Sequence, residues 1–227
     1  MIMAAFGMVP QDPAAGAELL SVLSRVGGRV TFVNIQPPQK QEGLKRFDRQ
    51  WKYYEVKGNG GGQAIAILVV AENPQETVTV MLPDGRVAMQ LWNQRNRFFA
   101  PTEGLTADGQ QVRNEFIHGL SAMCTGKVDH FLIRGTEPFL EIPGHKMSPF
   151  VWPFVIGTFC LGACCVHCLF PYPKVSKVLK AGAEVGTITF DPKRSFEAVA
   201  QDPEVLAGLI LMMGLKLYNR DFPQATA

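Results

Sequence analysis

The densest group of reactive side chains in the sequence is a set of four cysteines within nine residues: Cys160, Cys164, Cys165 and Cys168. Buried cysteines behave as small apolar side chains and need no function, whereas thiols beside an apolar surface are sites where acylation anchors a protein to a membrane. With His167 the group has the composition of a zinc site. However, two of the cysteines are adjacent and no second Cys-x-x-Cys pair exists. The spacing therefore predicts core residues or lipidation sites rather than a metal site.

The cysteines lie inside a long uncharged segment. Residues 147–173 contain no Asp, Glu, Lys or Arg, and the segment is flanked by Lys146 on one side and by Lys174, Lys177 and Lys180 on the other. Its length permits a membrane-spanning helix, but four prolines, two glycines and a histidine fit strands and turns better. Basic residues beside an acylatable apolar segment supply the two signals that stable peripheral anchoring requires. We therefore predict membrane association through this segment, with a span as the alternative.

No constellation of catalytic residues is visible in the sequence. The four histidines are scattered, and no serine lies in a nucleophile-elbow context. We therefore expect a protein that is not an enzyme. The balance of 22 basic and 20 acidic residues also argues against a dedicated nucleic-acid binder.

Cysteine usage and the N-terminus bear on the compartment. Five cysteines are an odd number, and their spacing is not that of a secreted disulfide framework, so a reducing compartment is favoured. Residues 1–9 are apolar but lack a basic region and are followed by Pro10, so we expect no signal peptide.

The elements that must position these residues are organised around one apolar helix near the C-terminus. Asp202 can cap the helix and Pro203 suits its first position, and residues 205–215 contain no polar side chain. A helix that is apolar all round lies in a core or a membrane, and 11 residues fall short of the roughly 20 that span a bilayer. We predict a core helix over about 203–220. Its buried residues include Val205, Leu209, Leu211 and Met212.

The rest of the chain has the pattern of short β-strands. Residues 14–26 favour a helix that ends at two glycines, so residues 1–28 are predicted as an N-terminal helical segment and residues 29–227 as one β-domain. Nine to twelve strands around one helix indicate a sandwich or a barrel. The strand signals fall at 29–35, 51–57, 64–71, 77–82, 86–92, 111–116, 130–134, 139–142, 174–180 and 184–190.

Several of these motifs occur in the order found in one family. From Phe47 to Phe222 the chain resembles phospholipid scramblases and the related tubby-like and LURP-one-related proteins. The resemblance implies a closed twelve-stranded barrel that holds the C-terminal hydrophobic helix in its lumen. The similar elements are residues 52–57, 61–63, the hairpin 78–87, the cysteine run 160–168, residues 184–188 and the final helix.

The resemblance also implies a calcium site directly before the final helix, and here the sequence departs from the family. Lys193 and Arg194 place two cations among the ligand positions, and Phe196 replaces a turn glycine. Calcium takes six to eight oxygen ligands, so we expect no functional calcium site and no other cofactor. A second family cysteine cluster, near residues 93–101, is also absent. The oxygen-bearing candidates that remain are Asp191, Ser195, Glu197 and Asp202.

Two functional interpretations follow. The first is a scramblase-like, membrane-associated protein that binds phospholipids or moves them across the bilayer. The second is a barrel that serves as a non-catalytic accessory subunit of a larger membrane assembly, with protein partners. The first makes a phospholipid membrane the partner, and the second makes other proteins the partners.

Overall fold

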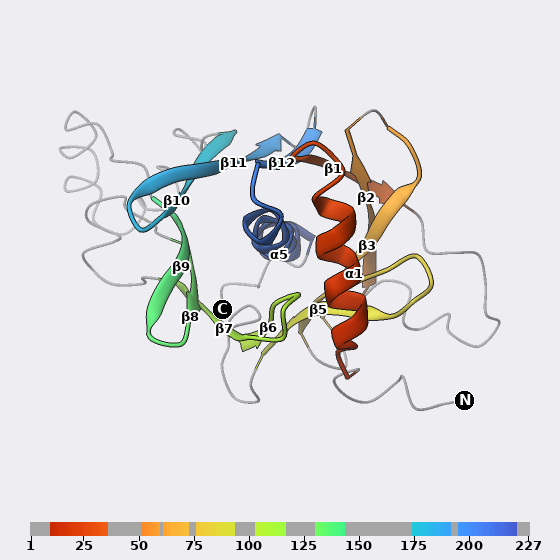
Figure 1. The fold of residues 1–227 in the computed structure, drawn as a ribbon, viewed down its shortest axis with the longest axis horizontal. Coiled ribbons are helices and arrows are strands. Elements are labelled where there is room, and N and C mark those ends of the chain that lie inside the picture. The colour runs from red at the N-terminus through yellow and green to blue at the C-terminus, as the bar shows by residue number, and fades with distance from the viewer. Residues whose placement is uncertain are drawn as a thin grey trace, which may run out of the picture.

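The computed structural model describes residues 10–35, 51–59, 61–72, 76–93, 103–116, 130–143, 174–191 and 195–221. These residues form twelve antiparallel strands in one closed barrel, in which neighbouring strands follow each other in the chain (Figure 1). The strands are β1 Arg29–Ile35, β2 Trp51–Gly58, β3 Ala64–Ala71, β4 Thr77–Met81, β5 Val87–Trp92, β6 Glu103–Leu105, β7 Gln111–Phe116, β8 His130–Arg134, β9 Glu137–Ile142, β10 Val175–Lys180, β11 Ala183–Asp191 and β12 Ser195–Ala200.

The first and last strands close the barrel. Arg29 of β1 lies opposite Val199 of β12, and Thr31 lies opposite Glu197. Closure pairs every strand on both sides and removes the exposed edges that an open sheet would present. The prediction of a mainly β fold with a closed twelve-stranded barrel is confirmed.

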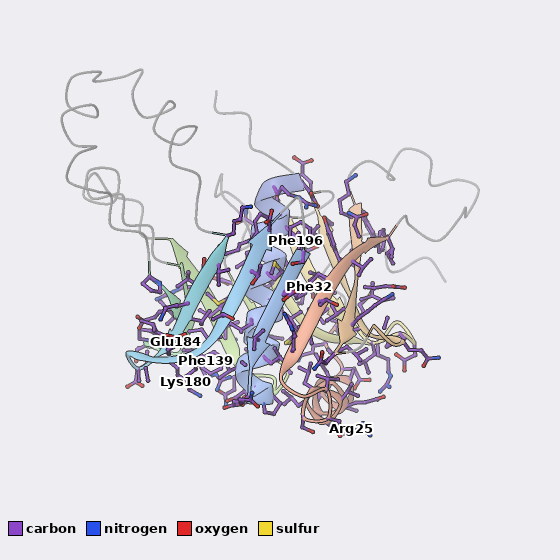
Figure 2. The ribbon with its side chains drawn as sticks, turned by 90° about the horizontal axis from the view of Figure 1, so that it is seen from above. Arg25, Phe32, Phe139, Lys180, Glu184 and Phe196 are labelled. Carbon is purple, nitrogen blue, oxygen red and sulfur yellow. The ribbon has the colours of Figure 1, made fainter. Side chains whose placement is uncertain are left out.

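The predicted core helix is α5, Pro203–Asp221, and it runs through the lumen of the barrel (Figures 1 and 2). Asp202 caps it, because its Oδ1 accepts hydrogen bonds from the backbone N–H groups of Glu204 at 2.8 Å and Val205 at 3.5 Å. The four residues predicted to be buried are at most 2% exposed. Those residues are Val205, Leu209, Leu211 and Met212.

The helix approaches the barrel wall most closely at two glycines. A Cβ atom at Gly208 would lie 2.5 Å from Leu140 Cδ1, and one at Gly214 would lie 2.3 Å from Val78 Cγ1. Both distances are far below van der Waals contact, so the absence of a side chain lets the wall pack directly against the helix backbone. The barrel interior is therefore a packed core with a helix as its centre.

A second helix, α1 (Pro13–Leu23), lies across the end of the barrel where α5 begins (Figures 1 and 2). Ala15, Leu19 and Leu23 are buried in the same hydrophobic cluster as the lumen. Its backbone comes so close to the wall that a Cβ at Gly16 would lie 1.9 Å from the Ala107 carbonyl oxygen. The N-terminal helix thus contributes to the core of the barrel. It ends three residues before the predicted Val26.

Neighbouring strands run in opposite directions, so successive connections lie at alternate ends of the barrel. The two ends therefore carry different sets of connections. At the entry end, where α5 begins, lie α1 and the tight turns, including the two-residue turn Ala181–Gly182 with φ values of 51° and 80°. At the exit end, where α5 finishes, lie the residues that border six other connections. Those bordering residues are Ile35, Trp51, Glu72, Glu76, Asn93, Glu103, Phe116, His130, Pro143, Lys174, Asp191 and Ser195.

Two strands were not predicted. β6 has only three residues, Glu103–Leu105, which is too short for an alternating pattern to be recognised. β12, Ser195–Ala200, falls in the stretch interpreted as a departure from a calcium segment, and it pairs with both β1 and β11. The predicted strands lie within two residues of the observed ones.

Candidate functional site

The exit end joins the uncharged segment to the barrel. Residues 144–173 connect β9 to β10, and both of the strand ends that border them lie there. The four candidate cysteines fall in this segment, outside the described residues, so their lipidation stays a prediction.

The basic flank that the sequence suggested beside this segment is not a cluster. β10 runs from the exit end to the entry end, so Lys174 and Lys180 are separated by roughly 20 Å of strand. Lys174 pairs with Asp191 at 2.9 Å, and Lys177 pairs with Glu184 at 2.6 Å. Only Lys174 of these three lysines stands at the exit end.

The four candidate calcium ligands do not come together either. Asp191 and Ser195 lie opposite each other on β11 and β12, and Asp191 is buried in its pair with Lys174. Asp202 caps α5 at the other end of the barrel, about 20 Å away along β12. Glu197 pairs with Arg29 at 2.6 Å. Within the described ranges, no three His, Cys, Asp or Glu side chains gather as metal ligands.

Aromatic and charged side chains line the lumen at the exit end. The rings of Phe190 and Phe196 face each other across β11 and β12, with centroids 5.0 Å apart. The Arg220 guanidinium lies 4.8 Å from the Phe196 ring centroid and 2.6 Å from Asp221 Oδ1. The hydroxyl of Tyr54 donates a hydrogen bond to Asp221 and accepts one from Arg220. This group fixes the last turn of α5 to β2 and β12.

Tyr54 remains a hydrogen-bond donor over the ordinary pH range. Burial, the hydrogen bond to Asp221 and the charge of that carboxylate together raise the pKa of Tyr54 well above its usual value. The hydroxyl is therefore protonated wherever the protein is folded near neutral pH.

Lys216 stands one helical turn before Arg220, and its position is unusual. It is half-buried, and its Nζ lies 5.9 Å from the Phe190 ring centroid. No carboxylate of the described residues lies within ion-pair distance of it, and burial lowers its pKa. In the sequence it lies between Leu215 and Leu217, as a lone charge in an otherwise apolar stretch.

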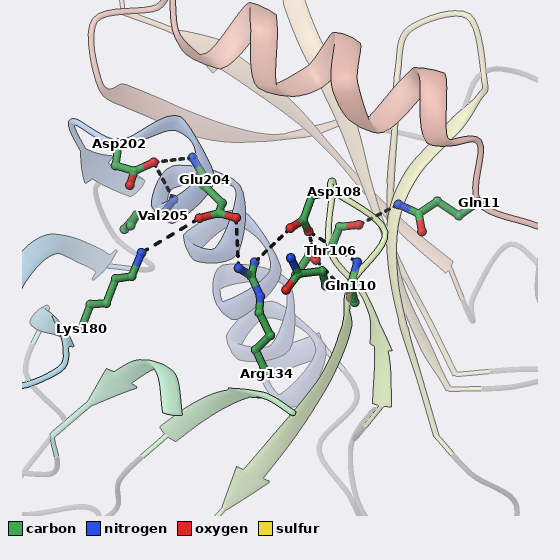
Figure 3. Close-up of polar contacts among 9 residues, drawn as sticks. All are labelled: Gln11, Thr106, Asp108, Gln110, Arg134, Lys180, Asp202, Glu204 and Val205. Carbon is green, nitrogen blue, oxygen red and sulfur yellow. Dashed lines mark hydrogen bonds and ion pairs between the residues drawn. The ribbon is translucent and has the colours of Figure 1, made fainter. Parts of the chain in front are cut away.

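A second polar group lies at the entry end (Figure 3). Arg134 reaches from β8 into the lumen, with Nη1 3.0 Å from Glu204 Oε1 and Nη2 3.6 Å from Asp108 Oδ2. Its guanidinium lies 4.0 Å from the Phe139 ring centroid. Burial opposes the charged form of Asp108, but the hydrogen bond from Thr106 and the charge of Arg134 hold its pKa below the usual value. The group links the first turn of α5 to the wall, a structural role that the sequence did not predict.

The outer wall carries a shallow hollow of about 240 Å³ beside the short strand β6. Glu103, Arg113 and Ile133 line it, together with Trp92. These side chains stand on the outside of the barrel, so the hollow is no route into the lumen. Of the two helices in the described ranges, neither is long and apolar enough to cross a membrane.

The comparison with known proteins found no match. No family model, no curated protein and no solved structure matches the chain.

Proposed function

We propose that the protein is a non-enzymatic, scramblase-like barrel that associates with phospholipid membranes through its exit end and needs no calcium. One observation carries the proposal. The six connections that join strands at that end include the uncharged segment and are net basic, whereas the rest of the chain is net acidic.

The charge distribution supports the proposal quantitatively. The six connections carry 11 Lys or Arg residues and five Asp or Glu residues, whereas the rest of the chain carries 11 basic and 15 acidic ones. Each basic side chain near an anionic bilayer contributes about 1 kcal/mol to binding. Apolar side chains and basic charge together are the two signals that hold a peripheral protein on a membrane. The connections concerned are residues 36–50, 72–76, 93–102, 117–129, 143–174 and 192–194.

The packed lumen favours binding of phospholipids over their movement through the barrel. α5 fills the interior, and α1 covers part of the entry end. A lipid has no path along the axis while α5 stays in place. The barrel then acts as a rigid base that presents one end to the membrane.

The packed lumen also favours a second candidate, an accessory subunit of a larger membrane assembly. A closed barrel with no exposed sheet edge and a packed core is stable without a bound substrate. In this case the connections at the exit end would contact protein rather than lipid.

Flotation with vesicles separates the two candidates. The full-length protein is mixed with phosphatidylcholine vesicles and with vesicles that also contain phosphatidylserine. Membrane binding predicts flotation with the anionic vesicles. Replacement of Lys45 and Arg46 by Gln is expected to reduce it, whereas replacement of Arg25 and Lys57 by Gln removes the same charge and serves as the matched control.

The absence of flotation with both vesicle types, for protein that is folded by circular dichroism, would contradict the membrane proposal and leave the accessory subunit. A further arm tests the cysteines. If the variant with all four cysteines replaced by Ser leaves the membrane fraction of cells while the wild type stays, acylation is part of the anchor.

A further inference from the structure

Lys216 is a charged side chain that the packing of the barrel does not explain. It belongs to the last part of α5, five residues before the described end of the helix, and it is half-buried in an apolar lumen. The nearby acidic groups of the exit end are engaged elsewhere. Asp191 pairs with Lys174, and Asp221 pairs with Arg220 and Tyr54.

An ammonium group that is removed from water without a counter-ion is costly, and its burial lowers the pKa of Lys216 accordingly. Two features offset part of this cost. The Phe190 ring 5.9 Å away attracts the cation, and the C-terminal end of a helix favours positive charge. Neither feature requires a lysine, because an apolar residue between Leu215 and Leu217 would continue the core.

We propose that Lys216 binds a phosphate group at the exit end of the barrel, with Phe190 beside the ammonium and Arg220 one turn further along. A phosphate supplies the counter-charge that the described residues do not provide to Lys216. Lysine is a common phosphate ligand because its ammonium acts as a compact point charge with three donors. The inference rests on the proposed function insofar as a bilayer presents a phosphodiester in every phospholipid.

Thermal unfolding with and without inorganic phosphate tests the site directly. We expect phosphate to raise the melting temperature of the wild type and of Lys216→Arg more than chloride does at equal ionic strength. Lys216→Met should lose the difference, since a lost hydrogen bond to a charged group weakens binding by about tenfold or more. Lys177→Met is the matched control, because Lys177 lies on the outer wall. An equal phosphate effect in all variants, or none in the wild type, overturns the site.

Vesicle flotation distinguishes a lipid phosphate from free phosphate. If wild type floats with anionic vesicles and Lys216→Met floats less, the phosphate group belongs to a lipid headgroup. If the wild type does not float but phosphate protection depends on Lys216, the ligand is free phosphate, and the inference stands while the membrane proposal fails. If both proteins float equally and phosphate protects neither, the membrane proposal stands and the inference fails.

Discussion

At the scale of single residues, the two ends of α5 use charge differently. At the entry end Arg134 and Glu204 form an ion pair across the lumen, and Asp108 completes the group. At the exit end Arg220 has Asp221, but Lys216 has only an aromatic ring among the described residues. A paired charge helps to hold the helix in place, whereas an unpaired buried charge lowers the stability of the folded protein.

Replacement of Lys216 by Met should therefore stabilise the protein, by about 1 kcal/mol near neutral pH. The folded-state pKa of Lys216 is lowered, so between that value and the unfolded value the unfolded state binds more protons. Wild-type stability should rise with pH through this window, up to about pH 10.4. Urea unfolding at pH 7 and pH 10 measures both effects. If Lys216→Met is less stable than the wild type, or if its stability rises with pH by the same amount as that of the wild type, this account is wrong.

Replacement of Arg134 by Met should destabilise the fold, by about 1 to 2 kcal/mol after allowance for partial exposure of the group. The change removes the cation that Glu204 and Asp108 share, and it leaves Glu204 only the longer pair with Lys180, at 4.0 Å. Denaturant unfolding at neutral pH checks the prediction. Lys177→Met removes an exposed pair and is expected to change stability by less than about 0.5 kcal/mol. If the two changes lower stability equally, the ion pairs of Arg134 add no more to the stability of the fold than an exposed surface pair does.

At the scale of elements, the contact of α5 with the wall depends on two glycines. In most helices a Gly-to-Ala change is favourable by roughly 1 kcal/mol, because Ala restricts the unfolded chain. At Gly214 the new methyl group would overlap Val78, whose Cγ1 is 2.3 Å from the Cβ position. The wall is itself a closed hydrogen-bonded sheet and cannot move away locally without a loss of pairing.

Gly214→Ala should thus destabilise the protein by about 1 to 3 kcal/mol, the usual cost of an overpacked core. The double variant with Val78→Ala should recover part of the loss, because the second change opens the required space. Gly62→Ala is the control, since no atom lies within 4 Å of its Cβ position. Thermal unfolding of the wild type, Gly214→Ala, Val78→Ala and the double variant gives the coupling, and strictly additive effects of the Gly214 and Val78 changes would refute the close contact.

At the scale of the whole molecule, net charge is divided between the barrel and its connections. The described residues are net acidic, and the connections at the exit end are net basic, although the whole chain has a charge of only +2. The balanced total of the chain is therefore the sum of an acidic set of described residues and a basic set of connections.

Binding to anionic vesicles should fall steeply with salt. The screening length is about 10 Å at 0.1 M and about 3 Å at 1 M salt, so the basic connections lose most of their attraction. Any residual binding at 1 M salt measures the apolar or acyl contribution. Flotation across a salt series checks this, with electrically neutral vesicles as the control. Binding that is insensitive to salt would show that charge is not part of the attachment.

Local sequence patterns predicted both helices and most of the strands. The apolar run 205–215 predicted a core helix, and alternation with strong turn residues predicted ten of the twelve strands, because both signals are local and repeat along one segment. β6 is too short to show an alternating pattern of apolar and polar residues. β12 lies in the segment that we compared with a calcium site because of its acidic residues, and its strand pattern was therefore missed.

Which side chains share an end of the barrel could not be predicted from the sequence. Lys174 and Lys180 are close in sequence but lie at opposite ends, and the same holds for Asp191 and Asp202. Lys216, by contrast, meets Phe190 from a distant strand. The physical reason is that strand direction and register, set by closure of the whole sheet, determine these positions, whereas sequence spacing records only distance along the chain.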